Sequence, residues 1–353
     1  MKIKATFLIS LLMLGGTYGY AQLSKNPNKF LGNITTMGSI RSDFDDYWNQ
    51  LTPENETKWA SVEGTRDVYN WGKVDTYYQY CKNHNFPFKF HTLIWGAQYP
   101  RWMDNLSQSE QLEEITEWFD AAAERYPDIE YIDVVNEALP GHQPAPYKNA
   151  LGGDGASGYD WIVTAFNMAR ERWPDAVLIY NDYNTFQWNT NGYIDLLKKI
   201  VAAGAPVDAA GCQAHDLNDM SGANFKTVLE KIHNQTGLPI LISEYDINKE
   251  DDQVQLTRYK EQIPIMWEAD YVAGVTIWGY IYGSTWLDYS GLIKNGVERP
   301  ALEWLREYML TDAAINAKSP LMNVGGFAYI SASANLVEIN TEVTIKGKAH
   351  SEN

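Results

Sequence analysis

Residues 129–137 read IEYIDVVNE, and residues 239–244 read PILISE. Each stretch is a short apolar run that closes on a glutamate, Glu137 in the first and Glu244 in the second. Such runs are typical of strands that are buried on both faces of a parallel sheet. Because a buried charge is costly without a partner, we expect the two glutamates to form a pair that the fold holds at a fixed separation.

Runs of the same kind recur along the chain and alternate with longer amphipathic runs. Helix signals mark the latter, as in residues 107–128, which carry a Ser cap, an acidic first turn and a Pro stop. About eight strand–helix repeats predict an α/β fold whose parallel sheet closes into a (β/α)8 TIM barrel. The predicted strands are residues 30–34, 50–53, 88–95, 129–136, 176–182, 208–214, 239–244 and 272–279.

An open, doubly wound sheet is the alternative architecture. That fold usually carries a glycine-rich phosphate turn after its first strand. The chain has no such turn, since the GGDG at 152–155 follows no predicted strand. The closed barrel is therefore favoured, over residues 24–311, a length that suits the usual size of about 250 residues and upward.

The two ends of the chain differ from this pattern. Residues 1–21 combine early lysines, an apolar run too short to cross a bilayer, and small residues before position 22. They predict a signal peptide, with an N-terminal anchor helix as the alternative, and hence a secreted, periplasmic or cell-surface protein. Residues 312–353 are small, polar and β-prone, and we expect a linker or partial β module there, or a disordered tail. No later segment resembles a membrane span.

The composition bears on partners. A net charge of −17 argues against nucleic acid, whose phosphates require Lys and Arg, but is compatible with a neutral polysaccharide. The 13 tryptophans and 23 tyrosines offer flat faces for sugar rings, or simply build a large aromatic core. Cys81 and Cys212 fall on opposite sides of the predicted barrel, so we expect two free, buried thiols.

Polar and aromatic residues collect at one end of the predicted strands. In a TIM barrel this carboxyl end carries the active site, and a purely structural barrel has no need of such a rim. The residues concerned are Glu54, Asn55, Lys58, His91, Trp95, Asn136, Glu137, Asn181, Asp182, Tyr183, Asn184, Gln213, His215, Asp216, Glu244, Asp246, Trp278 and Trp286.

Two carboxyl groups across a barrel mouth are the minimum equipment for hydrolysing a glycosidic bond. One must be protonated, to donate to the leaving oxygen, and the other ionised, to attack or to activate water. Asn136 can hydrogen-bond a sugar hydroxyl, and His215 with Asp246 can hold Glu244 ionised. A metal site at His215 and Asp216 is the alternative, but a carboxylate nucleophile explains these residues better.

Seven segments, in this order, resemble glycoside hydrolase family 10, the retaining endo-β-1,4-xylanases. They are LTPENETKW (51–59), HTLIWGAQYPRW (91–102), DVVNEA (133–138), NDYN (181–184), QAH (213–215), ISEYDI (242–247) and WGY (278–280). The likeness covers residues 28–310. It implies a secreted endo-β-1,4-xylanase that acts on xylan or arabinoxylan, needs no cofactor or metal, and is expected to be a monomer.

The resemblance also implies a role for each site residue. Glu137 is the acid/base and Glu244 the nucleophile, and Asn136 binds the 2-hydroxyl of the sugar being cleaved. His215 contacts Glu244, with Asp246 behind it. The remaining residues line sugar subsites: His91, Trp95 and Gln213 at the point of cleavage; Glu54, Asn55 and Lys58 on the non-reducing side; Trp278 and Trp286 as glycone walls; Tyr183 and Asn184 toward the leaving group.

Two departures from the family pattern stand out. Gly96 occupies a position where family members commonly have a histidine, so we expect a roomier subsite there. Tyr131-Ile132 precedes Asp133 where a tryptophan is common, with little expected consequence. A β-1,4-glucanase or another endo-β-glycanase remains the alternative enzyme, and a non-catalytic glycan-binding barrel the alternative class.

Overall fold

The computed structural model describes residues 22–321. Eight parallel strands form one sheet whose order runs β2-β1-β8-β7-β6-β5-β4-β3. The outer strands, β2 and β3, are joined by a single parallel bridge between Leu51 and Phe88, which closes the barrel. The strands are β1 Phe30–Ile34, β2 Leu51–Thr52, β3 Lys89–Ile94, β4 Tyr131–Asn136, β5 Val177–Asp182, β6 Ala209–Cys212, β7 Ile240–Tyr245 and β8 Val272–Ile277. The predicted TIM barrel is confirmed.

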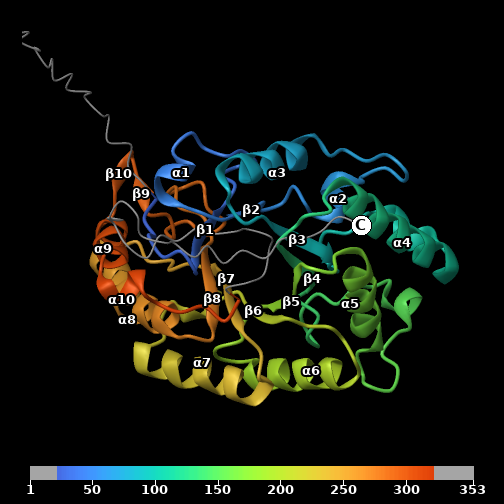
Figure 1. Ribbon diagram of the computed structural model, residues 1–353. Helices are drawn as coiled ribbons and strands as arrows, with labels where there is room; N and C mark the ends of the chain where they lie inside the picture. Colours follow the sequence, from blue (N-terminus) through green and yellow to red (C-terminus); the bar gives the residue numbers. More distant parts are fainter. Residues whose placement is uncertain (1–21, 322–353) are drawn as a thin grey trace, which may run out of the picture.

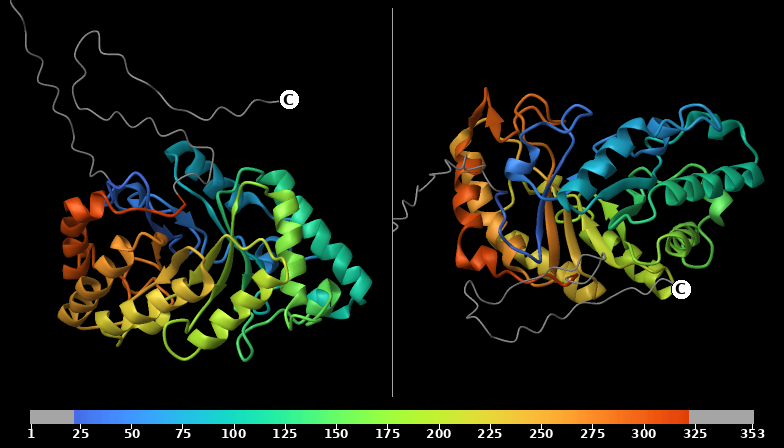
Figure 2. Two further views of the ribbon diagram at one scale, coloured as in Figure 1. Left: turned by 60° about the horizontal axis from the view of Figure 1, so that its bottom comes forward. Right: turned by 45° about the horizontal axis from the view of Figure 1, so that its top comes forward.

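Helices surround the strands, as Figures 1 and 2 show. The long helices are α3 Gly72–His84, α4 Gln108–Arg125, α5 Asp160–Arg172, α6 Thr190–Ala202, α7 Gly222–Thr236, α8 Asp252–Glu268 and α9 Pro300–Met309. Shorter elements are α1 Phe44–Tyr47, α2 Trp59–Val62, α10 Asp312–Ile315, the 3₁₀ turns η1 Arg101–Asn105, η2 Lys148–Leu151 and η3 His215–Leu217, and the hairpin of β9 Ile293–Lys294 and β10 Val297–Glu298. Within residues 22–321, no helix is both long and apolar enough to cross a bilayer.

Local signals account for several helix ends. Ser107 and Glu110 form a reciprocal capping box at the start of α4, which satisfies two backbone N–H groups. Pro300 occupies the first turn of α9, where its missing N–H costs nothing. Gly237 ends α7 with a φ of 71°, a conformation that a residue without Cβ adopts readily.

The strand ends differ from the sequence prediction by a few residues. β6, expected over 208–214, is confined to Ala209–Cys212, and β2, expected over 50–53, is confined to Leu51–Thr52. Pro53 has no N–H with which to extend the ladder, and the Gln50 side chain turns into the barrel, where its Oε1 accepts from Thr276 Oγ1 (2.8 Å).

The barrel interior is apolar at the end away from the carboxyl rim. Phe30 of β1 and Tyr131 of β4 belong to strands that are not neighbours, yet their ring centres are 5.3 Å apart. They therefore meet across the interior, where Val177, Ile179 and Leu241 join the same cluster. This packed floor leaves the upper interior and the carboxyl rim for polar side chains.

Two expectations concern the remaining parts of the chain. Cys81 and Cys212 are free and fully buried, as predicted. Residues 312–315, expected to begin a linker or β module, instead form helix α10, because Ala314 packs into the core and its carbonyl oxygen accepts from Trp267 Nε1 (2.9 Å). The predicted signal peptide (1–21) and residues 322–353 lie outside the described residues.

Candidate active site

Glu137 sits directly after β4, at the carboxyl end of the barrel. Its backbone is left-handed, with a φ of 56°, and its N–H donates to the carbonyl oxygen of Asn181 on β5 (2.8 Å). The side chain lies between donors from two other strand ends. Trp95 Nε1 donates to Oε2 (3.0 Å) and Gln213 Nε2 to Oε1 (2.9 Å). Glu137 is thus held by neutral donors.

Glu244 is buried near the end of β7 and has a different set of partners. Asn181 Nδ2 donates to its Oε1 (2.8 Å), and His215 Nε2 lies 3.1 Å from its Oε2. The other nitrogen of His215, Nδ1, lies 2.9 Å from Asp246 Oδ2. Trp286 Nε1 donates to the same oxygen of Asp246 (2.8 Å). Glu244 is therefore backed by an imidazole that a second carboxylate orients.

Three amide side chains connect the two glutamates. Gln213 Nε2, which bonds Glu137, also lies 3.4 Å from Asn136 Oδ1. Asn181 Nδ2, which bonds Glu244, donates to that same oxygen (2.9 Å). Asn136 Nδ2 is buried and has no partner among residues 22–321, although buried donors are normally satisfied. The glutamates thus share one site, which presents an unused donor.

The surroundings shift the pKa values of the two carboxyl groups in opposite directions. Burial raises the pKa of Glu137 to about 7, helped by the negative charge of Glu244 and only partly offset by the Gln213 hydrogen bond. Burial also acts to raise the pKa of Glu244, but the His215 hydrogen bond, with the charges of His91 and His215, outweighs it and lowers the pKa to about 2. Near neutral pH the site therefore offers one protonated acid and one carboxylate.

His215 holds its charge despite burial. Burial acts to lower its pKa, but the Asp246 carboxylate and the contact with Glu244 raise it to about 10. The ring is therefore an imidazolium that bridges two carboxylates. Asp216 takes no part in this arrangement, since its Oδ2 accepts from the backbone N–H of Phe186 (2.9 Å).

A charged group beneath the site was not predicted from the sequence. Asp133 of β4 is fully buried, and its Oδ2 lies 2.9 Å from Lys89 Nζ and 2.8 Å from His91 Nδ1. His91 in turn packs edge-on against Trp278, with ring centres 5.4 Å apart. Ionisable residues in the middle of two predicted strands were the available signal, because burial there demands a partner.

Further predicted residues form the rim on the side of β2 and β3. Lys58 Nζ donates to Asn55 Oδ1 (3.0 Å) and lies 4.7 Å from the ring centre of Trp95. Burial lowers the pKa of Lys58, and the negative charges of Glu244 and Glu54, which act to raise it, offset only part of this effect. A cation, an amide and a carboxylate therefore stand beside the glutamate pair.

Two tryptophans follow β8 at the rim. Trp278 is buried, whereas Trp286 is 54 % exposed and lies edge-on to His215, with ring centres 4.7 Å apart. Tyr183 and Asn184 follow β5 and are partly exposed. The structure thus brings all fifteen residues of the predicted site to strands β2 to β8 or to the segments directly after them, at the carboxyl end of the barrel.

Comparison with known proteins identifies this barrel. The family model for glycosyl hydrolase family 10 matches residues 16–313. The chain belongs to glycosyl hydrolase family 10.

Individual relatives of this family 10 hydrolase were found by sequence and by structure. Endo-1,4-β-xylanase B of Cellvibrio japonicus is 51 % identical over 278 residues, which are 78 % of this chain and 45 % of that protein. Endo-1,4-β-xylanase A of Caldicellulosiruptor saccharolyticus is 30 % identical and covers 69 % of this chain and 78 % of its own. Native xylanase 10B of Thermotoga maritima shares the fold, with a TM-score of 0.70, 24 % identity, and coverage of 81 % of this chain and 96 % of its own. The chain thus spans under half the length of its Cellvibrio relative.

The departure at Gly96 does not open a subsite in this family 10 hydrolase, so that expectation is wrong. The place of a side chain is taken by the backbone of the segment after β4. A Cβ on Gly96 would stand 2.4 Å from the carbonyl oxygen of Pro144 and 2.5 Å from that of Gln143. The Gly96 N–H donates to the latter oxygen (3.0 Å). Main chain therefore fills the space that a roomier subsite would need.

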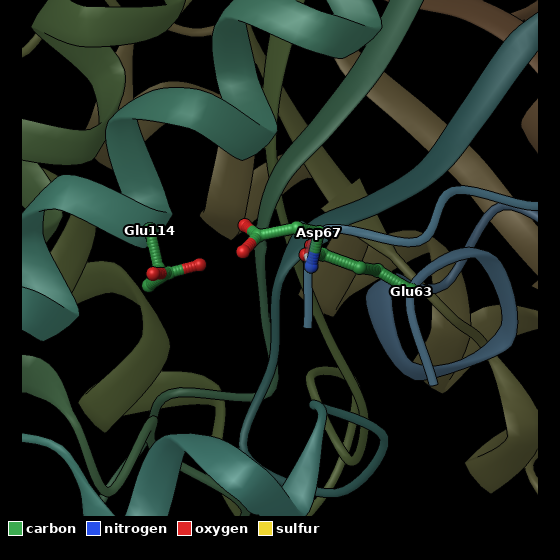
Figure 3. A group of neighbouring side chains, drawn as sticks. All are labelled: Glu63, Asp67 and Glu114. Carbon is green, nitrogen blue, oxygen red and sulfur yellow. Dashed lines mark hydrogen bonds between the residues drawn. The ribbon is translucent and has the colours of Figure 1, made fainter. Parts of the chain in front are cut away.

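A second acidic cluster lies apart from the glutamate pair, between the segment after α2 and helix α4 (Figure 3). One oxygen from each of Glu63, Asp67 and Glu114 lies within 4.8 Å of the others, which is a spacing that a metal ion could bridge. Arg66 already pairs with Glu114, and Glu63 accepts from Trp59 Nε1 (2.7 Å). These contacts give the buried carboxylates partners within the protein.

Proposed function

We propose that this family 10 hydrolase is an endo-β-1,4-xylanase that cleaves the xylan backbone with retention at the anomeric carbon. The observation that carries the proposal is the pairing of Glu137 and Glu244 in one hydrogen-bonded site, where their different partners shift the two pKa values in opposite directions. The substrate follows from relatives that are named endo-1,4-β-xylanases. Because the chain spans 45 % of the first of them, the proposal rests on the shared part.

The division of labour follows from the two pKa values. Glu137, with a pKa of about 7, protonates the departing glycosidic oxygen, while Glu244, with a pKa of about 2, attacks the anomeric carbon. A covalent xylosyl-enzyme forms and the glycosidic bond breaks. Glu137, now ionised, takes a proton from water, which displaces Glu244 and releases the sugar with its configuration retained. No step calls for a metal or cofactor.

The rim residues supply sugar contacts in this proposal. The unpartnered Nδ2 of Asn136 donates to the 2-hydroxyl of the sugar being cleaved. Lys58, with Glu54 and Asn55, binds the next sugar on the non-reducing side. Trp278 and Trp286 form the wall on the glycone side, and Tyr183 and Asn184 lie toward the leaving group.

Two substitutions test the roles of the glutamates. Glu244→Ala should abolish turnover of every glycoside, because no nucleophile remains. Glu137→Ala should lose turnover of xylan but keep the first step on aryl xylosides, whose phenolate departs without a proton. Glu124→Ala, on the exposed face of α4, serves as the matched control. Equal losses on both substrate types in Glu137→Ala would contradict the assigned roles.

Substrate and stereochemistry need separate measurements. Reducing ends released from xylan, carboxymethyl cellulose and mannan should appear with xylan first. Preference for cellulose would favour the glucanase alternative, and no release from any polymer the non-catalytic one. Proton NMR of the first product should show the β-anomer, since an α-anomer would require inversion.

We also propose that the enzyme acts outside the cytoplasm, as a monomer. The lysines and short apolar run of residues 1–21 support export. Expression of the full chain should release a protein whose N-terminal sequence begins after residue 21, and retention of residues 1–21 would favour an anchor. Sedimentation should give the mass of one chain.

A further inference from the structure

The segment between β4 and η2 is fixed to the catalytic strand ends. The backbone N–H of Gln143 donates to the carbonyl oxygen of Glu137 (2.8 Å), and that of Leu139 donates to Asp182 Oδ2 (3.2 Å). At its far end, Tyr147 is buried and its hydroxyl lies 3.5 Å from the carbonyl oxygen of Trp95. The segment is thus a built wall of the cleft, attached at both ends.

His142 is the side chain that this segment holds against the site. It is 5 % exposed, and its Nδ1 lies 2.5 Å from Oδ1 of the fully buried Asp182. The opposite oxygen of Asp182 accepts from the Tyr180 hydroxyl (2.6 Å). The imidazole ring stacks on Tyr183, with centres 3.7 Å apart and planes 11° from parallel. Asp182 thus fixes the imidazole, and the imidazole fixes one face of Tyr183.

The stacked pair stands beside the proposed acid/base. Burial raises the pKa of Tyr183, and the negative charge of Glu137 raises it further. Burial acts to lower the pKa of His142, but the Asp182 carboxylate outweighs it and raises that pKa, with a smaller contribution from Glu137. Both rings therefore lie within the electrostatic reach of the group that protonates the leaving oxygen.

We propose that His142 is a positioning residue for the leaving-group side of the cleft, where its ring holds Tyr183 in the orientation that receives the departing sugar. The inference rests on the proposed function. A tyrosine ring on a rim has alternative rotamers, and a sugar that binds must select one of them at an entropic cost. The stack removes that cost in advance and leaves the other face of Tyr183 for the sugar.

Gly96 makes this arrangement possible. A methyl group at that position would push Gln143 and Pro144 away from the end of β3, because it would fall within 2.5 Å of their carbonyl oxygens. His142 adjoins Gln143 and would move with it. Gly96→Ala should therefore have the same effect on activity as a substitution of His142.

The test compares a substrate that fills the leaving-group side with one that does not. Xylotetraose places sugars there, whereas fluoride, the leaving group of β-xylobiosyl fluoride, fills no sugar subsite and needs no proton. His142→Gln keeps a hydrogen-bonding group but removes the ring, and His142→Phe keeps the ring but removes the bond to Asp182. Tyr183→Ala removes the platform itself.

In His142→Gln, kcat/KM for xylotetraose should fall about three- to tenfold, which corresponds to the energy of one aromatic contact. For β-xylobiosyl fluoride, kcat/KM should stay within about twofold of the wild-type value. His142→Phe should recover most of the loss, and Gly96→Ala should behave like His142→Gln. In a Tyr183→Ala background, His142→Gln should add nothing further.

Two results would overturn the proposal. One is an equal loss on both substrates in His142→Gln, which would indicate a structural role. The other is a His142→Phe variant as impaired on xylotetraose as His142→Gln, because the ring would then not be the active feature. If His142→Gln does not fold, Gly96→Ala takes its place: it should lower kcat/KM for xylotetraose but not for the fluoride, and should add nothing further in a Tyr183→Ala background, and any other outcome would overturn the proposal. A wild-type protein that hydrolyses neither substrate would instead contradict the proposed function.

Discussion

Replacement of Glu137 by glutamine should stabilise the protein, and more so as the pH rises. The pKa of Glu137 is about 7 in the fold, against an ordinary value of 4.5. Below pH 4.5 the carboxyl group is protonated in both folded and unfolded chains and carries no penalty. As the pH rises from 4.5 to 7, the unfolded chain ionises while the folded chain stays protonated, so the free energy of unfolding falls.

The magnitude follows from the same two values. The full difference between 4.5 and about 7 corresponds to about 3 kcal/mol above pH 7. Between pH 5 and pH 8 the wild type should lose about 2.5 kcal/mol through this one group. Glutamine has nearly the same shape and no charge, so the Glu137→Gln variant escapes that loss.

Urea denaturation of wild type and Glu137→Gln at pH 5, 6, 7 and 8 measures the effect. The difference in unfolding free energy between the two proteins should grow by about 2.5 kcal/mol across this range. Glu124→Gln on the surface of α4 should show no such growth, and it controls for the loss of one negative charge. A Glu137→Gln curve that runs parallel to the wild type would refute the assignment of a raised pKa to Glu137.

Three further predictions concern other parts of the barrel. Asp133→Asn leaves the buried ammonium of Lys89 without its carboxylate, and urea denaturation should show a loss of about 3–5 kcal/mol. Trp286→Ala removes a ring that is 54 % exposed, so KM for xylan should rise about two- to tenfold while the melting temperature stays nearly unchanged. Cys81 and Cys212 are fully buried, and burial raises the pKa of both thiols, so a disulfide-exchange reagent should modify them in urea but not in the native protein.

The sequence predicts the barrel well because its strands are buried, and burial leaves a recognisable pattern of apolar runs. Strands covered on both faces need uninterrupted apolar runs, and each run is followed by the polar residues of the rim. In proportion to its length β2 was the least accurate, since only two of its residues pair with β1 and its other contact in the sheet is a single bridge to Phe88. Such a short strand has too few residues to show a period.

Side chains inside the barrel were harder to predict. Lys89 begins β3 and Asp133 stands in the middle of β4, and a sequence pattern shows only that two charges interrupt apolar runs. Their pairing depends on the register of β3 against β4, which aligns Lys89 with Tyr131 and His91 with Asp133. Sequence order carries no information on that register, because the strands are separated by a whole helix.

His142 was missed for a related reason. It lies in a Pro- and Gly-containing segment, LPGHQPAPY, which ends no strand and shows no period. Its place beside Tyr183 comes from the contact of that segment with Gly96 and from the carboxylate of Asp182. The sequence indicates a departure at Gly96, but a missing side chain does not reveal which part of the chain occupies the space.

One turn contributes to the difference between the two glutamates. Ala214 has a φ of 71°, and this left-handed residue separates Gln213 from His215. Gln213, a neutral donor, bonds Glu137, while His215, a cation, bonds Glu244. A neutral donor cannot offset the burial of a carboxylate as a buried cation does. The tripeptide QAH after β6 therefore contributes directly to making one glutamate an acid and the other a nucleophile, although both follow similar apolar runs in the sequence.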